Sequence, residues 1–165
     1  PLVPEKPVDH SNYISSLPES TRAKLVHFGV LDYTNTQSQL DAATVEDKSK
    51  VVYLDKLGQT NAAAFAALLQ PLTSQTKLAV VLDCESLTPD YFPGVSNPAV
   101  FGLVEAEIFA ILEALGSAGA CLKTLAFANF NPAVESRRSA DCLLYMIYSY
   151  LQAGTRKSEL LAALN

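Results

Sequence analysis

Two acidic side chains, Asp83 and Glu85, follow directly after an apolar run from Ala79 to Leu82. Such a run predicts a strand that is buried on both faces. Because side chains alternate along an extended chain, carboxylates one residue apart point the same way. Ligand sites of open α/β sheets lie beyond the carboxyl ends of their strands. The pair is therefore the first candidate for an active site or a metal site.

The loop after this strand carries motifs that occur together in a known family. Asp83-Cys84-Glu85 is followed by Pro93-Gly94-Val95-Ser96-Asn97-Pro98 and by Gly102-Leu103. These segments resemble the second metal-binding segment of the arginase/ureohydrolase family. Upstream, residues 29–37 (GVLDYTNTQ) resemble a signature of its formiminoglutamase branch. Residues 129–132 (NFNP) are similar to the family's Glu-x-Asn-Pro motif.

The three motifs stand in the family's order and at its spacing, from about Lys24 to Leu151. They correspond to the C-terminal half of a family member. The resemblance implies a fold like the C-terminal half of the arginase fold. It also implies the family's reaction, in which water bridged between two manganese ions hydrolyses guanidino- or formimino-type C–N bonds.

Several positions depart from the pattern that this reaction needs. In the family, an Asp-x-Asp segment supplies metal ligands, and here Glu85 replaces the second Asp. The longer carboxylate still suits a hard cation. Asn129, however, stands where the family usually has the Glu that faces the substrate, and Ala126 stands where an Asp is common. A neutral amide does not balance a guanidinium-like substrate, and alanine offers it no polar contact.

The other ligands of a binuclear site are not found in this sequence. The family takes them from a lone His and an Asp-x-His-x-Asp segment in its N-terminal half, whereas His10 and His27 have no ligand-like neighbours. We therefore expect no catalytic residue, no bound metal and no other cofactor. Asp83 and Glu85 are then vestigial, and Asn129 is a remnant of the substrate position. Manganese is expected only if a second chain supplies the missing ligands.

The cysteines suggest neither catalysis nor a disulfide framework. Cys84 lies between the two carboxylates without a His/Asn set to activate it, so we expect a buried, inert thiol. With Cys121 and Cys142 it makes an odd number of widely spaced cysteines, which suits a reducing compartment. We expect an intracellular protein of the mitochondrial matrix or the cytoplasm.

Apolar runs alternate with helical segments along the chain, which favours an α/β fold with a mostly parallel sheet and helices on both faces. The sequence predicts strands over residues 24–31, 51–54, 79–83 and 122–128, paired in a single sheet. It predicts helices over residues 36–44, 59–69, 105–115, 136–152 and 156–164. Gly116 and Gly154 are interpreted as helix stops.

The proline-rich residues 1–21 predict an extended N-terminal arm, followed by a half ureohydrolase-like α/β domain over residues 22–165. A mobile terminus is the alternative interpretation of the arm. The net charge of −5 and the lack of a basic stripe argue against nucleic-acid contact. No apolar run approaches the roughly 20 residues that a membrane span needs.

Two predicted helices are unusually free of charge, over residues 59–70 and 142–154. A helix that packs on a sheet with one face normally shows ionised residues on the other. We expect other protein to cover these helices, and the candidate contact residues are Phe65, Tyr145, Tyr148 and Leu151. The alternative is that small side chains such as alanine tolerate exposure to water.

These observations lead to two hypotheses of function. In the first, the chain is a catalytically inactive formiminoglutamase/arginase-like protein that acts as a structural or interaction subunit of a hetero-oligomeric assembly. In the second, it is one chain of a split or nicked metal-dependent ureohydrolase that cleaves a linear amidine or guanidine C–N bond. A partner chain then supplies the missing half, and Asp83 and Glu85 contribute ligands.

Overall fold

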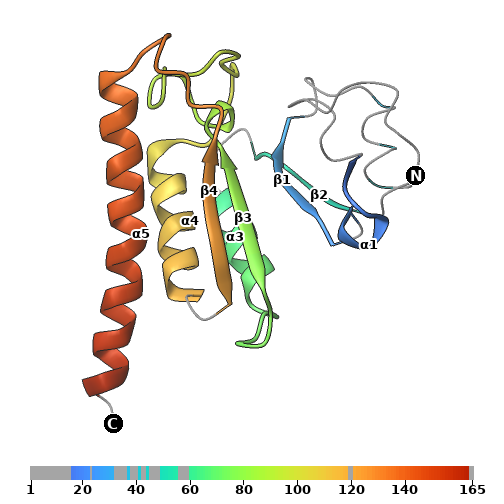
Figure 1. Cartoon of the computed structure of the whole chain (residues 1–165), viewed down its shortest axis with the longest axis vertical. Coiled ribbons are helices and arrows are strands. Elements are labelled where there is room, and N and C mark those ends of the chain that lie inside the picture. The colour runs from blue at the N-terminus through green and yellow to red at the C-terminus, as the bar shows by residue number, and fades with distance from the viewer. Residues whose placement is uncertain are drawn as a thin grey trace. The chain divides into compact units, whose positions relative to one another are not determined.

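The computed structural model describes residues 16–22, 24–31, 37, 41, 44, 49–55, 60–118 and 121–163 (Figure 1). The chain divides into two compact units, Pro1–Tyr53 and Leu54–Asn165. Most of the expected N-terminal arm and of the helix expected over residues 36–44 lies outside the described residues.

The first unit contains a pair of parallel strands. β1 (Val26–Val30) pairs with β2 (Lys50–Tyr53), and α1 (Glu19–Arg22) precedes them. The register of the pair shifts between Phe28 and Val30, where Gly29 has a φ of 77°. Only glycine adopts this left-handed conformation without strain, so Gly29 permits the local irregularity in β1.

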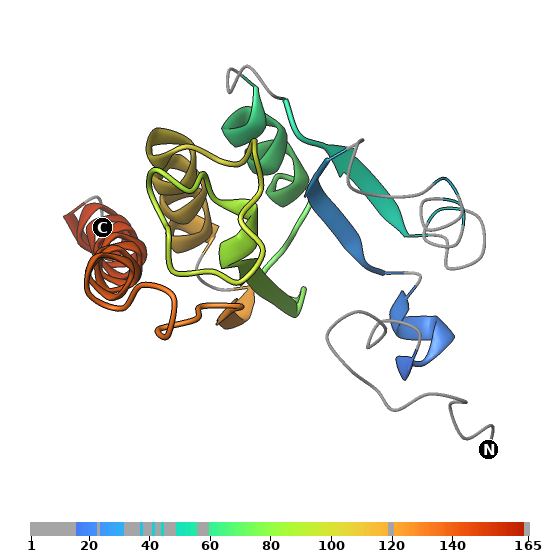
Figure 2. The same cartoon turned by 90° about the horizontal axis from the view of Figure 1, so that it is seen from above.

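The second unit carries three long helices and a second pair of parallel strands. In chain order these are α3 (Asn61–Leu69), β3 (Leu78–Asp83), α4 (Glu105–Ala118), β4 (Leu122–Ala128) and α5 (Arg137–Ala163). β3 and β4 are parallel, and α4 connects them. α4 packs against α5 on one side and α3 on the other, which places the helices over one face of β3–β4 (Figure 2).

The core of this unit lies between α4, the sheet and the loop after β3. Its largest fully buried side chains are Phe92, Leu87, Ile108, Leu112, Leu115 and Met146. Ile108, Ile111, Leu112 and Leu115 recur at helical spacing, which is why α4 buries one continuous stripe. Full burial of one such side chain contributes about 1.5–3 kcal/mol.

The two faces of β3–β4 differ in their exposure to water. Leu82 is buried on the face that the helices cover, whereas Ala79, Val81 and Asp83 are exposed on the other. Val81 lies in the middle of the strand and is 62% exposed. This alternation shows that only one face of the sheet is covered within the described part of the unit.

The α/β class with parallel strands is confirmed, and all four predicted strands form. The prediction of one four-stranded sheet is wrong, because the described strands make two separate sheets of two strands each. No ladder joins β1 or β2 to β3 or β4 in the described residues. Apolar runs mark where strands form, but the order of strands depends on which edges meet in space.

The predicted ends of the last helices are also wrong. α4 continues past Gly116 to Ala118, and α5 runs through Gly154 as one helix, so no separate helix begins at Arg156. A Cβ atom at Gly116 would lie 2.6 Å from the Tyr150 carbonyl oxygen and 2.7 Å from the Ala153 Cβ atom. Gly116 therefore serves the close approach of α4 to α5 rather than helix termination, whereas Gly154 lies in the interior of α5.

None of the described helices combines the length and apolar character that a membrane crossing requires.

The helix contact predicts opposite effects for two glycine-to-alanine substitutions. Gly116→Ala should lower the free energy of unfolding by about 1–3 kcal/mol, because the added methyl group overpacks the α4–α5 contact. Gly154→Ala should be neutral or stabilise by up to about 1 kcal/mol, because alanine favours a helix interior and its Cβ would lie 3.7 Å from the Gly116 carbonyl oxygen. Urea unfolding of both variants measures the difference. Equal effects would contradict the packing role of Gly116.

Candidate functional site at the carboxyl ends of β3 and β4

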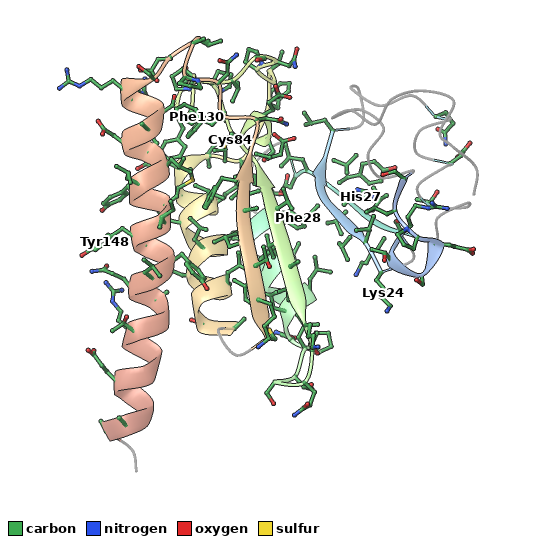
Figure 3. All side chains as sticks on the ribbon, in the orientation of Figure 1. Lys24, His27, Phe28, Cys84, Phe130 and Tyr148 are labelled. Carbon is green, nitrogen blue, oxygen red and sulfur yellow. The ribbon has the colours of Figure 1, made fainter. Side chains whose placement is uncertain are left out.

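The candidate site lies where the second sheet ends. β3 ends at Asp83, and a single 3₁₀ turn, Cys84–Ser86, follows it. The register pairs Asp83 with Ala128, the last residue of β4. Asn129 comes next in the chain, and the neighbouring Phe130 lies at the same end of the sheet as Cys84 (Figure 3).

The Asp83 carboxylate is held by two nitrogen donors. Its Oδ1 atom accepts hydrogen bonds from the side-chain Nδ2 of Asn129 and the backbone N–H of Glu85, both at 2.9 Å. Asn129 has a φ of 63°, in the left-handed region that asparagine tolerates better than most residues. The chain turns sharply here, so the amide lies against the end of the neighbouring strand.

The Glu85 carboxylate is bound in a similar way by the following loop. Its Oε1 atom accepts from the backbone N–H of Asn97 at 3.0 Å and from the Asn97 Nδ2 at 3.1 Å. The same loop contacts the segment after β4, because Asn131 donates from Nδ2 to the Ser96 Oγ at 2.8 Å. Each of the two carboxylates thus has one oxygen engaged by amide donors.

The loop is anchored on the first turn of α5 by a partly buried network. The Gly94 N–H donates to the Ser139 Oγ at 2.8 Å, and this hydroxyl donates to the Glu135 Oε2 at 2.7 Å. Hydrogen bonds from the Ser139 side chain, and then from the Arg138 and Ser139 backbone, lower the pKa of Glu135. A Cβ atom at Gly94 would lie 2.6 Å from the Ser139 Oγ, so this position requires glycine.

Cys84 is unsuited to nucleophilic chemistry. Its side chain is fully buried. Burial raises the pKa of the thiol to about 12, and the neighbouring negative charges of Asp83 and Glu85 contribute to the same shift. The thiol is therefore protonated at neutral pH, whereas a thiolate is the reactive form.

The structure brings together three of the predicted site residues, Asp83, Glu85 and Asn129. Ala126 pairs with Val81 further down the sheet and adds no polar atom to the site. His27 belongs to β1 in the first unit. His10 lies outside the described residues.

The predicted partner-contact residues lie on the helices of the second unit. Tyr145, Tyr148 and Leu151 are 58%, 54% and 58% exposed on α5, and Phe65 on α3 is half-buried. The Tyr145 ring packs edge-on against Phe109 of α4, with ring centroids 5.4 Å apart.

Sequence reasoning gave no role to the loop residues that complete the site. In the sequence, Asn97 is recognisable only as part of the Pro93–Pro98 motif, and the Glu135–Ser139 pair carries no signal of its own. An asparagine next to a proline indicates a turn, but it does not show which carboxylate its amide reaches.

The residues present do not fit a pair of manganese ions. The described part of the chain contains no group of three His, Cys, Asp or Glu side chains placed to hold a metal ion. The Asp83 Oδ1 and the Glu85 Oε1 each accept two hydrogen bonds from N–H groups, so the second oxygen of each carboxylate is the one left to bind a cation. Two carboxylate oxygens are too few ligands for two metal ions.

The family model of the arginase family matches residues 4–152. The chain belongs to the arginase family. Proclavaminate amidinohydrolase of Streptomyces clavuligerus is 28% identical over 94 residues, which make up 57% of this chain and 30% of that protein. The Trypanosoma cruzi formiminoglutamase structure at pH 4.6 superimposes with a TM-score of 0.76 at 22% identity.

The match extends over about half of the T. cruzi formiminoglutamase chain and over less of proclavaminate amidinohydrolase. It covers 93% of this chain and 51% of the T. cruzi formiminoglutamase chain at pH 4.6. A structure of that enzyme solved with manganese gives a TM-score of 0.69 at 23% identity over 78% of this chain and 42% of that chain. The fold of this arginase-family chain therefore corresponds to part of the fold of its relatives.

Two substitutions of Asn129 test the interaction with Asp83. Asn129→Asp should lower the free energy of unfolding at neutral pH by about 1–3 kcal/mol, because it replaces a donor by a second carboxylate. Asn129→Gly loses the same hydrogen bond but suits the left-handed backbone, so its effect should be smaller. Unfolding experiments from pH 7 to pH 3 provide the measurement.

The two variants should also differ in their dependence on pH. The repulsion in Asn129→Asp raises a carboxyl pKa in the folded protein, so its cost should disappear as pH falls and that carboxyl takes up a proton. The stability of Asn129→Gly relative to the unmodified chain should change less. Parallel pH profiles for the two variants would show that Asp83 and Asn129 are not electrostatically coupled.

Proposed function

We propose that this arginase-family domain is catalytically inactive and acts as a structural or interaction subunit of a larger protein assembly. The observation that carries the proposal is the hydrogen bond from the Asn129 Nδ2 to the Asp83 Oδ1 at 2.9 Å. An amide donor satisfies one oxygen of the carboxylate that the family resemblance marks as a metal ligand. The site is thereby stabilised without a cation.

The second carboxylate supports the same conclusion. Glu85 binds both nitrogens of Asn97, so binding of a cation by this oxygen would have to break two hydrogen bonds. Each hydrogen bond contributes about 0.5–1.5 kcal/mol, and bonds to charged groups contribute more. The exchange would also leave the amide donors in need of new partners.

The surface of α5 supports a role in assembly. Leu144, Tyr145, Tyr148 and Leu151 lie at helical spacing and are each more than half exposed. Figure 3 shows Tyr148 on the side of α5 that faces away from α4. Contiguous apolar surface of this kind marks protein-interaction sites in folded proteins. We name these four residues the α5 stripe.

The split-enzyme hypothesis remains the second candidate, and the half-length match to the relatives favours it. Under this hypothesis, another polypeptide segment supplies metal ligands, and the amides of Asn97 and Asn129 move away from the carboxylates. Metal content and activity of the assembled protein distinguish the two candidates. The expectation of a reducing, intracellular compartment stays a prediction, and the three cysteines are free thiols.

The catalytic part of the proposal is tested by metal and activity measurements. We expect neither stoichiometric manganese by elemental analysis nor hydrolysis of formiminoglutamate or arginine, for the chain alone and for the complex purified through a tag on it. The reason is that amides bind the two carboxylates. Manganese together with hydrolysis in the complex would establish the split enzyme instead.

The assembly part of the proposal is tested on the α5 stripe. Tyr148→Asp combined with Leu151→Asp should prevent incorporation of the chain into its complex, because burying unpaired carboxylates in an interface is costly. Val100→Asp is the control, since Val100 is a loop residue with 77% exposure. Size-exclusion chromatography and pull-down of the tagged chain measure incorporation. A folded double variant that assembles as well as the control would contradict the role of the stripe.

A further inference from the structure

The apolar part of the exposed face of α5 is arranged symmetrically about Tyr148. Tyr145 lies three residues before Tyr148 and Leu151 lies three residues after it, and all three side chains are more than half exposed. Residues three, four, seven and eleven positions apart share one face of a helix, because eleven residues make three turns. The α5 stripe is therefore centred close to Tyr148.

The charged residues beyond the α5 stripe have opposite signs at matching distances from this centre. Arg137 lies eleven residues before Tyr148, and Glu159 lies eleven residues after it. Nearer the stripe, Asp141 precedes Tyr148 by seven residues and Arg156 follows it by eight. All four charged side chains are exposed. Each charge at one end of the face therefore has a charge of opposite sign at the corresponding place at the other end.

We propose that α5 packs against α5 of a second copy of this chain, with the two helices antiparallel about a two-fold axis close to Tyr148. Tyr145 of one copy then lies against Leu151 of the other, and the two Tyr148 rings meet at the axis. This inference rests on the proposed assembly role of the α5 stripe and names its occupant.

The charges distinguish the antiparallel pair from its alternatives. In this pair, Arg137 of each copy faces Glu159 of the other, and Asp141 of each copy faces Arg156 of the other. A parallel pair would place each charge against its own equivalent, and such like-charge contacts are costly. A two-fold interface requires a surface that complements itself, whereas a surface that binds a different protein has no such requirement. The symmetric order of charges around Tyr148 therefore favours a second copy.

The packing of α5 within one copy leaves this face available. Ser139, Met146 and Ala153 recur every seven residues and are buried, and they lie on the face opposite the stripe. In Figure 1, α5 is the outermost helix of its unit. Residues 137–159 span about 33 Å at 1.5 Å per residue. A contact between two single helices of this length is small for a protein interface, which predicts a reversible dimer.

The contacts of these side chains within one copy are compatible with the dimer. Arg156 Nη1 lies 4.0 Å from the Glu113 Oε1, and both side chains are about two-thirds exposed. Such an exposed ion pair contributes little, so Arg156 remains available to Asp141 of a second copy. The Tyr148 hydroxyl accepts a hydrogen bond from the Gln152 Nε2, which satisfies the polar atom of the ring at the axis.

Charge reversal tests the pairing of the two copies by sedimentation equilibrium. Arg137→Glu and Glu159→Arg should each raise the Kd of the dimer about tenfold or more, because both symmetric contacts become repulsive. The chain with both substitutions should return to within about threefold of the unmodified Kd, because the pairs form again with exchanged signs. Both substitutions agree with the helix dipole, so α5 should stay folded, and circular dichroism verifies this.

The outcomes separate this inference from the proposed function. A chain that stays monomeric up to about 1 mM overturns the inference, and so does a double variant that dimerises no better than the single ones. Binding of a different protein through the α5 stripe without self-association also overturns it but leaves the proposed assembly role intact. Metal and hydrolysis measurements are independent of these results, so they test the proposed inactivity separately.

Cysteine cross-linking tests the direction of the two helices. Asp141 and Thr155 lie seven residues on either side of Tyr148, so they face each other across the antiparallel pair. Under mild oxidation, a mixture of Asp141→Cys and Thr155→Cys chains should form a mixed disulfide dimer, whereas neither variant alone should cross-link more than the unmodified chain. The unmodified chain is the control for the native cysteines. Self-cross-linking of each variant, or no cross-linking in the mixture, contradicts the antiparallel arrangement.

Discussion

The hydrogen bond between Asp83 and Asn129 joins the carboxyl ends of β3 and β4, and the organisation of the site depends on it. It connects residues 46 positions apart in the chain. The Asp83 carboxylate also caps the turn through the Glu85 N–H, so one oxygen fixes both the end of β3 and the start of the loop. From there the loop binds Glu85 through Asn97 and reaches α5 through Gly94. A carboxylate that has this structural role is less available to a metal ion.

The packing of α4 against α5 supports the loop that carries the candidate site. α4 and α5 approach closely because Gly116 lies against the Tyr150 carbonyl group and Ala153. Ser139 lies in the first turn of α5 and is fully buried. Its Oγ accepts a hydrogen bond from the Gly94 N–H. The position of the loop is therefore coupled to the packing of the two helices. Buried, satisfied polar contacts of this kind favour one arrangement over its alternatives.

The positions of the strands, and the proximity of Asp83 to Asn129, could be predicted from the sequence. Apolar runs located the strands. Because parallel strands end at the same edge of a sheet, Asp83 and Asn129 were expected to lie together. Two kinds of feature were not predictable. Glycine has the same local signature whether it ends a helix or permits close packing, so Gly116 and Gly154 were misassigned. The partner of Glu85 depends on the path of a long loop, which local turn residues do not define.

The distribution of exposed apolar residues connects the candidate site to the proposed assembly. The charge-free segment expected to be covered lies within α5, and its stripe is exposed in the isolated chain. Val81 is exposed on the uncovered face of β3–β4. A covering segment that reached only one of these surfaces would leave the other in water. Because Val81 and Asp83 lie on one face of β3, a protein that covered Val81 would also lie beside the candidate site, which links the proposed assembly to that site.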